Sequence, residues 1–119
     1  MAGAPPVLDQ LIARFDDSAF DAPAGHARLR LAVDDVGEWD FLVRPSSRRL
    51  EPADRDERPD ARLCADRATW VRVARDLRGG MNAFRSGRLQ IRDDLHLGVG
   101  FLAATSSRDE KGRLELARV

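Results

Sequence analysis

The spacing of the apolar residues changes along this chain, and that change restricts the folds it can adopt. Residues 28–33 and 39–44 place an apolar side chain at every second position, which is typical of half-buried strands. Residues 36–38 form a turn between them, so the two strands are expected to pair as a hairpin. From Arg67 onward the apolar residues recur every three or four positions, which is typical of one helix face. The chain must therefore combine strands with helices.

The remaining segments bring the expected total to about five strands and three or four helices. Asp66 is placed to cap the helix that starts at Arg67, and Gly79 and Gly80 are expected to end it, because glycine tolerates the left-handed C-cap conformation. Residues 51–60 are rich in acids and proline and are expected to form an exposed connecting loop, or a recognition loop. The other predicted strands cover residues 48–51, 61–65 and 89–91, and the other predicted helical segments cover residues 8–15 and 81–85.

Residues 95–104 fit a helix and a strand equally well. Asp94 could cap a helix, yet Leu95, Leu97, Val99 and Phe101 alternate with less apolar residues as they would in a strand. The two glycines inside this segment each cost a helix about 1 kcal/mol relative to alanine. Propensity therefore favours strand or loop, whereas periodicity leaves both conformations open.

A length of 119 residues with 43% hydrophobic residues predicts one soluble globular domain over residues 1–119. Within it, residues 1–27 are expected to form an N-terminal helix and loop, and residues 105–119 a charged turn followed by an edge strand or linker. No export signal or apolar stretch long enough to span a membrane is visible. The single cysteine, Cys64, rules out an internal disulfide. These features together predict a cytoplasmic protein.

Charge and motif content argue against several classes of function. The 20 basic residues are balanced by 20 acidic ones, and acids are interleaved with arginines almost everywhere, so no nucleic-acid partner is expected. The densest basic group, at residues 44–49, is interpreted as a solvated turn. No serine lies in a nucleophile elbow, no glycines form a phosphate-binding loop, and Cys64, His26 and His96 lack the paired spacing of zinc ligands. The sequence therefore predicts no enzyme activity, no metal site and no cofactor.

The order of signals over residues 60–104 resembles one known family. Asp60 and Ala61 open an alternating strand, Thr69 and Trp70 begin a helix, a glycine turn follows, and the segment AFRSGRLQI at residues 83–91 runs into Asp94. This series is similar to that of the sterol carrier protein type-two domain family. Residues 39–50 resemble the Trp-bearing hairpin of that family more weakly, so the likeness covers about residues 28–104. Arg88 stands where the family usually has lysine, and Asp93 where it usually has glycine.

This resemblance implies an α+β fold, in which helices cover one face of a largely antiparallel five-stranded sheet and enclose an apolar tunnel. Each side chain expected to line the tunnel is also an ordinary core residue when taken alone, so the tunnel is a hypothesis about the whole set. The set consists of Trp70, Val73, Leu77, Met81, Phe84, Leu89, Ile91, Leu95, Val99, Phe101 and Leu102. Gly98 and Gly100 are expected to widen the tunnel, so that leucine at either position would raise the melting temperature and reduce lipid binding.

Two functions follow from the resemblance. The first is a non-enzymatic module that binds or transfers a sterol, a fatty acid or another acyl chain. The second is an accessory or interaction domain of a larger polypeptide, such as one of the hydrolase type. In that role the domain has no ligand of its own and contacts a protein partner or a second copy of the chain. The strand-like ending of residues 114–119 is where a catalytic partner could begin or dock.

Overall fold

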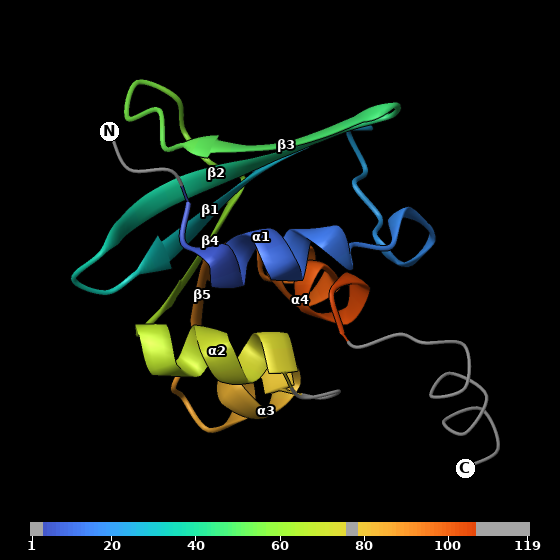
Figure 1. The fold of residues 1–119 in the computed structure, drawn as a ribbon. Coiled ribbons are helices and arrows are strands. Elements are labelled where there is room, and N and C mark those ends of the chain that lie inside the picture. Colours follow the sequence, from blue (N-terminus) through green and yellow to red (C-terminus); the bar gives the residue numbers. More distant parts are fainter. Residues whose placement is uncertain (1–3, 76–78, 107–119) are drawn as a thin grey trace, which may run out of the picture.

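The described helices all lie on one face of a five-stranded sheet, as Figure 1 shows. The computed structural model describes residues 4–75 and 79–106. This architecture confirms the predicted α+β class with helices over one face of the sheet. In chain order the elements are α1 (Pro6–Ala13), the 3₁₀ turn η1 (Asp17–Ala19), β1 (Ala27–Val33), β2 (Gly37–Arg44), β3 (Ser47–Pro52), β4 (Ala61–Ala65), α2 (Arg67–Arg75), α3 (Gly79–Arg85), β5 (Gln90–Asp93) and α4 (Leu95–Ala104).

The sheet is mixed rather than largely antiparallel, which corrects the expectation from the sequence. Its strand order is β3-β2-β1-β4-β5. β2 pairs antiparallel with β1 and β3, and β5 pairs antiparallel with β4, but the central strands β1 and β4 are parallel, with Leu31 beside Leu63. The cause is the connection of residues 53–60, which leads from the edge strand β3 to the far side of β1. β4 therefore runs in the same direction as β1.

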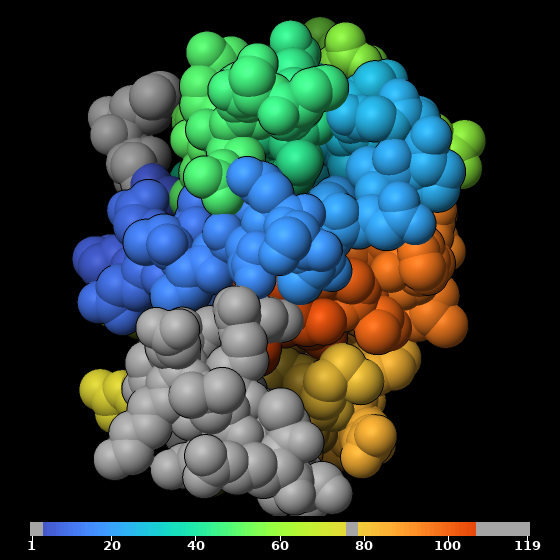
Figure 2. Space-filling model, turned by 90° about the vertical axis from the view of Figure 1, so that its right-hand side faces the viewer, coloured from blue at the N-terminus to red at the C-terminus, as the bar shows by residue number. Residues whose placement is uncertain are grey.

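Alternate side chains of the strands form the sheet face that the helices cover. Leu31 of β1, Phe41 of β2 and Leu63 of β4 are completely buried, as the period of two predicts. The centroid of the Phe41 ring lies 5.0 Å from that of Phe15 and 5.8 Å from that of Phe101. These contacts join the end of the N-terminal helix to α4 across the sheet, and Figure 2 shows the N-terminal residues in blue beside α4 in orange-red.

Residues 95–104 form the helix α4, which resolves the choice that periodicity left open. The Asp94 Oδ1 atom accepts a hydrogen bond from the Leu97 backbone N–H at 3.1 Å and so caps the first turn. Gly98 lies where α4 packs on β5, and a Cβ atom there would overlap the Ile91 side chain. The helical cost of this glycine is thus offset by close packing that a larger residue would prevent.

Gly79 and Gly80 do not cap the end of α2, as the sequence suggested, but form the first turn of α3. Neither residue has a positive φ, so the left-handed conformation expected of a C-cap is not used. A Cβ atom on Gly79 would overlap the backbone of Arg72, and one on Gly80 would lie 2.9 Å from Cδ2 of Leu102. The two glycines therefore allow α3 to pack directly on α2 and α4.

Arg14, the residue after α1, ties together the ends of three helices. Its Nε and Nη2 atoms donate to the Thr105 carbonyl at 3.1 and 2.7 Å, Nη2 donates to the Val73 carbonyl at 3.2 Å, and Nη1 donates to the Ala74 carbonyl. Carbonyls in the last turn of a helix lack partners within the helix, and they carry partial negative charge. Burial lowers the pKa of Arg14, but a guanidinium remains charged at neutral pH.

The other predicted elements are present with small shifts of their ends. The predicted helix at residues 8–15 corresponds to α1, and the predicted strands at residues 48–51, 61–65 and 89–91 correspond to β3, β4 and β5. The turn and strand expected within residues 107–119 lie outside the described residues. No helix in the described ranges is both long enough and apolar enough to cross a membrane.

Candidate functional site

The helix α2 supplies the central apolar side chain of the candidate site, Trp70. The Asp66 Oδ1 atom accepts the Thr69 backbone N–H at 2.8 Å, which confirms the predicted N-cap. Hydrogen bonds from the Thr69 hydroxyl and backbone N–H hold the pKa of Asp66 below its ordinary value. Trp70 is 0% exposed, and its Nε1 atom donates to the Ala32 carbonyl of β1 at 3.0 Å. Because a buried indole N–H needs an acceptor, this bond fixes α2 on the sheet.

Most of the other predicted tunnel residues lie on or beside α3, α4 and β5. These elements are connected by packing, because α3 packs on α4 and α4 packs on β4 and β5. Five of the predicted residues are fully buried, namely Trp70, Val73, Leu89, Phe101 and Leu102. Four are partly buried, namely Met81 and Phe84 of α3, Ile91 of β5 and Val99 of α4. Met81, Phe84 and Ile91 pack against the core. Leu77 lies outside the described residues.

Leu95 lies apart from the others, with 53% of its surface exposed at the start of α4. A strand would have placed it on the same face as Phe101, but a helix turns it away from the core. Leu97, which the prediction left out of the site, is buried on α4. The spacing of four between Leu97 and Phe101 is the signal that could have identified it.

Gly98 does not create the empty space that was expected of it. The side chain of Ile91 occupies the position beside it, and a Cβ atom on residue 98 would overlap Ile91 Cγ2. At Gly100 a Cβ atom would lie 3.6 Å from Cδ1 of Phe20, which is an ordinary contact with the loop after α1. The premise that leucine at residue 98 would fill a void and stabilise the protein is therefore wrong.

None of the described residues that were predicted to line the tunnel lies in the wall of the following three pockets. One lies between α2 and α3, with a volume of about 230 Å³. A second, of about 330 Å³, lies at the turn between β1 and β2 beside Arg62 and Cys64. A third, of about 250 Å³, lies between residues 17–25 and the end of β2. The expected tunnel between the sheet and the helices is not one of these three.

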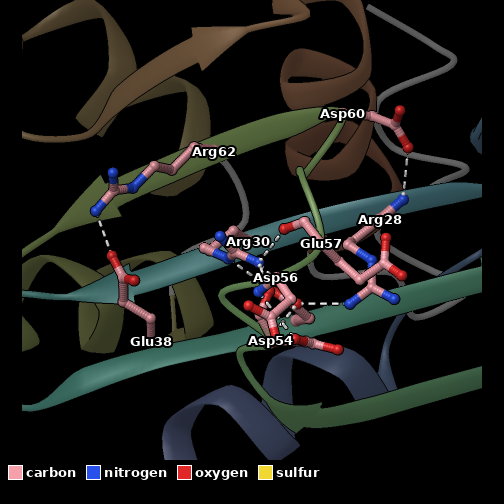
Figure 3. Close-up of polar contacts among 9 residues, drawn as sticks. Arg28, Arg30, Glu38, Asp54, Asp56, Glu57, Asp60 and Arg62 are labelled. Carbon is pink, nitrogen blue, oxygen red and sulfur yellow. Dashed lines mark hydrogen bonds and ion pairs between the residues drawn. The ribbon is translucent and has the colours of Figure 1, made fainter.

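The opposite face of the sheet carries a charged network that sequence reasoning missed (Figure 3). Asp40 of β2 is 0% exposed, and its carboxylate accepts from Arg28 Nη1 at 2.7 Å and from Arg30 Nε and Nη2 at 2.8 and 3.0 Å. It also accepts the Asp54 backbone N–H at 3.1 Å. Arg30 Nη2 donates in turn to the Asp54 and Glu57 carbonyls. The loop of residues 53–60 is thereby held over this face.

Two opposing effects set the pKa of Asp40. Burial raises it, but hydrogen bonds from Arg30, from the Asp54 N–H and from Arg28 outweigh burial and hold the pKa below its ordinary value. The Asp40 hydrogen bond is also the main reason that the pKa of Arg30 is raised. Arg30 and Asp40 are paired directly across β1 and β2, so the hairpin register was the signal that could have revealed this network.

Cys64 and His96 were considered as metal ligands, and the structure shows the surroundings of each side chain. Cys64 is half-buried, and burial raises the pKa of its thiol, which disfavours the reactive thiolate. The side chain of His96 is 69% exposed and lies 4.0 Å from the Asp21 carboxylate. Across residues 4–75 and 79–106, no group of three or more His, Cys, Asp or Glu side chains could hold a metal ion.

A model of a known protein family matches this chain. The SCP-2 sterol transfer family matches over residues 8–103, which is most of the chain. A comparison with curated protein sequences gives no match.

Several solved structures share the fold. A structure described as the UbiJ-SCP2 ubiquinone synthesis protein matches with a TM-score of 0.57 and 16% identity, covering 86% of this chain and 79% of the other. Sterol carrier protein 2 like 2 from Aedes aegypti matches with a TM-score of 0.53 and 14% identity, covering 82% and 91%. The sec-alkylsulfatase Pisa1 from Pseudomonas sp. matches with a TM-score of 0.60 and 18% identity over 89% of this chain but only 17% of its own. The fold thus occurs both as a small protein and as a minor part of a larger chain.

Proposed function

Because the chain belongs to the SCP-2 sterol transfer family, we propose that it is a non-enzymatic module that binds a sterol, a fatty acid or another acyl chain. The proposed ligand lies between the helices and the inner face of the sheet, near the contacts of α4 with α3 and with β5. The observation that carries this placement is that these three elements hold four apolar residues that are only partly buried, namely Met81, Phe84, Ile91 and Val99. We call these four side chains the apolar margin.

Three of the four margin residues, Met81, Phe84 and Ile91, pack against the buried core, so a hydrocarbon placed against them would be shielded from water on that side. Burial of about 500 Å² of a sterol or acyl chain at ~25 cal/mol/Å² gives a gross gain of about 12 kcal/mol. Association costs on the order of 4–15 kcal/mol, so micromolar affinity needs no hydrogen bond to the ligand. Selection among lipids would then depend on shape and length rather than on polar groups.

The short helix α3 is the element that would move to admit a ligand. It has seven residues, and its two N-terminal glycines pack against the Arg72 backbone and Leu102 with no side chain of their own. Only Ala83, Gly79 and Gly80 of α3 are fully buried. An outward shift of α3 would open the space behind the apolar margin, at the cost of the close packing of Gly79 on α2 and of Gly80 on α4.

Displacement of a fluorescent fatty acid from the purified chain tests this placement. Phe84→Gln adds a polar group to the apolar margin, and we expect it to weaken binding at least tenfold. Val36→Gln is the control, because Val36 is an apolar residue with 50% exposure at the β1–β2 turn and is not one of the four margin residues. Met81→Gln provides a second test if Phe84→Gln proves unstable.

Each outcome of this experiment decides between alternatives. A weakened Phe84→Gln variant beside a normal Val36→Gln variant supports the proposed site. If the wild-type chain binds no fatty acid, sterol or other acyl lipid, the lipid-binding function is wrong. Equal affinity of both variants and the wild type would mean that lipid binds elsewhere.

An accessory or protein-interaction role is the second candidate. The observation favouring it is the sulfatase, in which the same fold accounts for a small part of a much longer polypeptide. In that role the chain would carry no lipid and would instead bind a protein partner or a second copy of itself. Size measurements of lipid-free protein discriminate the two functions, because the interaction role requires association in the absence of lipid.

A further inference from the structure

Arginine is distributed unevenly along the chain. Residues 67–92 contain seven arginines and one acidic residue, Asp76, whereas basic and acidic residues balance over the whole chain. The even interleaving of acids and arginines expected from the sequence therefore fails over residues 67–92. Where several arginine side chains line the same surface, they raise the local concentration of anions.

A pocket of about 230 Å³ lies inside this basic region, between α2, α3 and the residues that precede β5. Arg72 of α2 and Arg88 line it, together with Asn82 of α3 and Ser86, the residue after α3. Its described lining contains no Asp or Glu side chain. We call it the arginine pocket.

The two arginines of the pocket are not neutralised by the part of the chain that the structure describes. Within that part, neither Arg72 nor Arg88 takes part in an ion pair or a side-chain hydrogen bond. Asp66 is close enough for the charge of Arg88 to act on it. However, Asp66 accepts two hydrogen bonds from Thr69 as the cap of α2, and its single charge cannot balance two guanidinium groups.

The polar groups of the pocket suit an oxyanion. Guanidinium groups present paired N–H donors that match the oxygens of a phosphate or carboxylate. The Asn82 amide adds two donors that have no acceptor among the described residues. The Ser86 hydroxyl already donates to the Ala83 carbonyl at 3.1 Å, so it contributes no donor. The net result is a set of donors without competing internal acceptors.

The arginine pocket and the apolar margin lie on different sides of α3. Asn82 and Ser86 both line the pocket, and the Ser86 backbone N–H donates to the Asn82 carbonyl as in a helical turn, so the two residues lie on one side of α3. Met81 and Phe84 are three residues apart and point to the other side. An anion in the pocket would consequently not be the head of the hydrocarbon proposed for the margin, and the two sites can be tested separately.

We propose that the arginine pocket binds a phosphate group through Arg72, Arg88 and the Asn82 amide. The phosphate could belong to an anionic lipid in a membrane surface or to a free phosphate compound, and both present the same charge and the same oxygens. This assignment does not depend on the proposed lipid-binding function of the apolar margin.

Titration of the full chain with inorganic phosphate at low ionic strength tests the pocket, with chemical shifts or heat as the readout. The variant Arg72→Gln/Arg88→Gln is expected to bind phosphate at least tenfold more weakly than the wild type. Arg44→Gln/Arg55→Gln is the matched control, because it removes the same charge from exposed arginines outside the pocket and is expected to bind normally. Thermal melts check that both variants are folded.

Sedimentation with phosphatidylcholine vesicles, with and without phosphatidic acid, distinguishes the two sources of phosphate. Binding of phosphate and of acidic vesicles, both lost in Arg72→Gln/Arg88→Gln, supports a lipid headgroup. Binding of phosphate without binding of vesicles supports a free phosphate compound. Failure of the wild type to bind phosphate, or an equal loss in both double variants, overturns the proposal.

Discussion

Asp40 is the central acceptor of the charged network on the outer face of the sheet. A fully buried carboxylate is costly unless several donors satisfy it, and Asp40 has two arginines and one backbone N–H. These bonds also join β1 and β2 to the loop of residues 53–60. That loop was expected to be a solvated connector, and in the structure its backbone completes a buried ion pair.

We expect Asp40→Asn to destabilise the protein by about 3 kcal/mol, because it leaves the buried Arg30 guanidinium without its charged partner. Urea unfolding at neutral pH measures this loss. Glu51→Gln is the control, since Glu51 pairs with the exposed Arg49 and such a surface pair contributes less than about 1 kcal/mol. Similar losses in the two variants would contradict the role given to Asp40.

The same carboxylate predicts a pH dependence. Its pKa in the folded protein lies below the unfolded value of about 3.9, so the ionised group stabilises the fold above that pH. This contribution is lost as the pH falls below about 4 towards the folded pKa. Asp40→Asn should therefore lose less stability than the wild type over that range. A wild type and a variant with parallel pH profiles would contradict the assignment.

The roles of some individual residues could be predicted from the sequence, and the roles of others could not, for a physical reason. The N-cap of Asp66 and the burial of Trp70 depend on neighbours in the chain, so local pattern predicts them. The pairing of Arg30 with Asp40 follows from the hairpin register and could have been predicted. The burial of that pair depends on a loop that is more than ten residues away in sequence, which local pattern does not reveal.

The helix α4 shows how packing between elements decides a conformation that propensity leaves open. Its two glycines disfavour a helix, but the Asp94 cap and the contact with β5 stabilise one. Gly98 is required where α4 crosses Ile91, whereas Gly100 faces Phe20 with room for a methyl group. The two glycines thus have different structural roles in the same helix.

We expect Gly98→Ala and Gly100→Ala to have opposite effects on stability. Alanine at residue 98 overlaps Ile91 Cγ2 and should cost about 1–3 kcal/mol despite its better helix propensity. Alanine at residue 100 meets Phe20 at an ordinary distance and should stabilise by up to about 1 kcal/mol. Melting temperatures of the two variants give the comparison. Stabilisation by both would show that α4 and β5 are less closely packed than described.

Elements with a strong local signal were predicted well, and their contacts were not. The period of two in β1, β2 and β4 and the helical period of α2 identified these elements from sequence. Gly79 and Gly80 were assigned to a C-cap, because the sequence shows where glycines occur but not which residues pack against them. In the structure these are the Arg72 backbone and the Leu102 side chain. The convergence of three helix ends on Arg14 had no sequence signal at all.

On the scale of the whole molecule, the family and the α+β class were predicted and the strand directions were not. Motif order along residues 60–104 was enough to indicate the family, which the match over residues 8–103 confirms. The parallel pairing of β1 with β4 arises from a long connection, so alternation within each strand carries no information about it. The tunnel and its lining remain part of the proposed function.

The molecule also carries two different surfaces, one apolar and one basic, which the net charge of zero does not reveal. The apolar margin lies on one side of α3, and the arginine pocket lies on the other. A chain with these two surfaces could hold a hydrocarbon while its basic side contacts a phosphate. The proposed lipid-binding function requires only the first.

Native mass spectrometry of the freshly purified chain tests the lipid-binding proposal most directly. We predict a population of monomers that each carry one lipid molecule, which is released on collisional activation. Added fatty acid should convert the remaining empty chains to the same one-to-one complex. Chains that stay empty after fatty acid, sterol and phospholipid have each been added in excess would contradict the proposal.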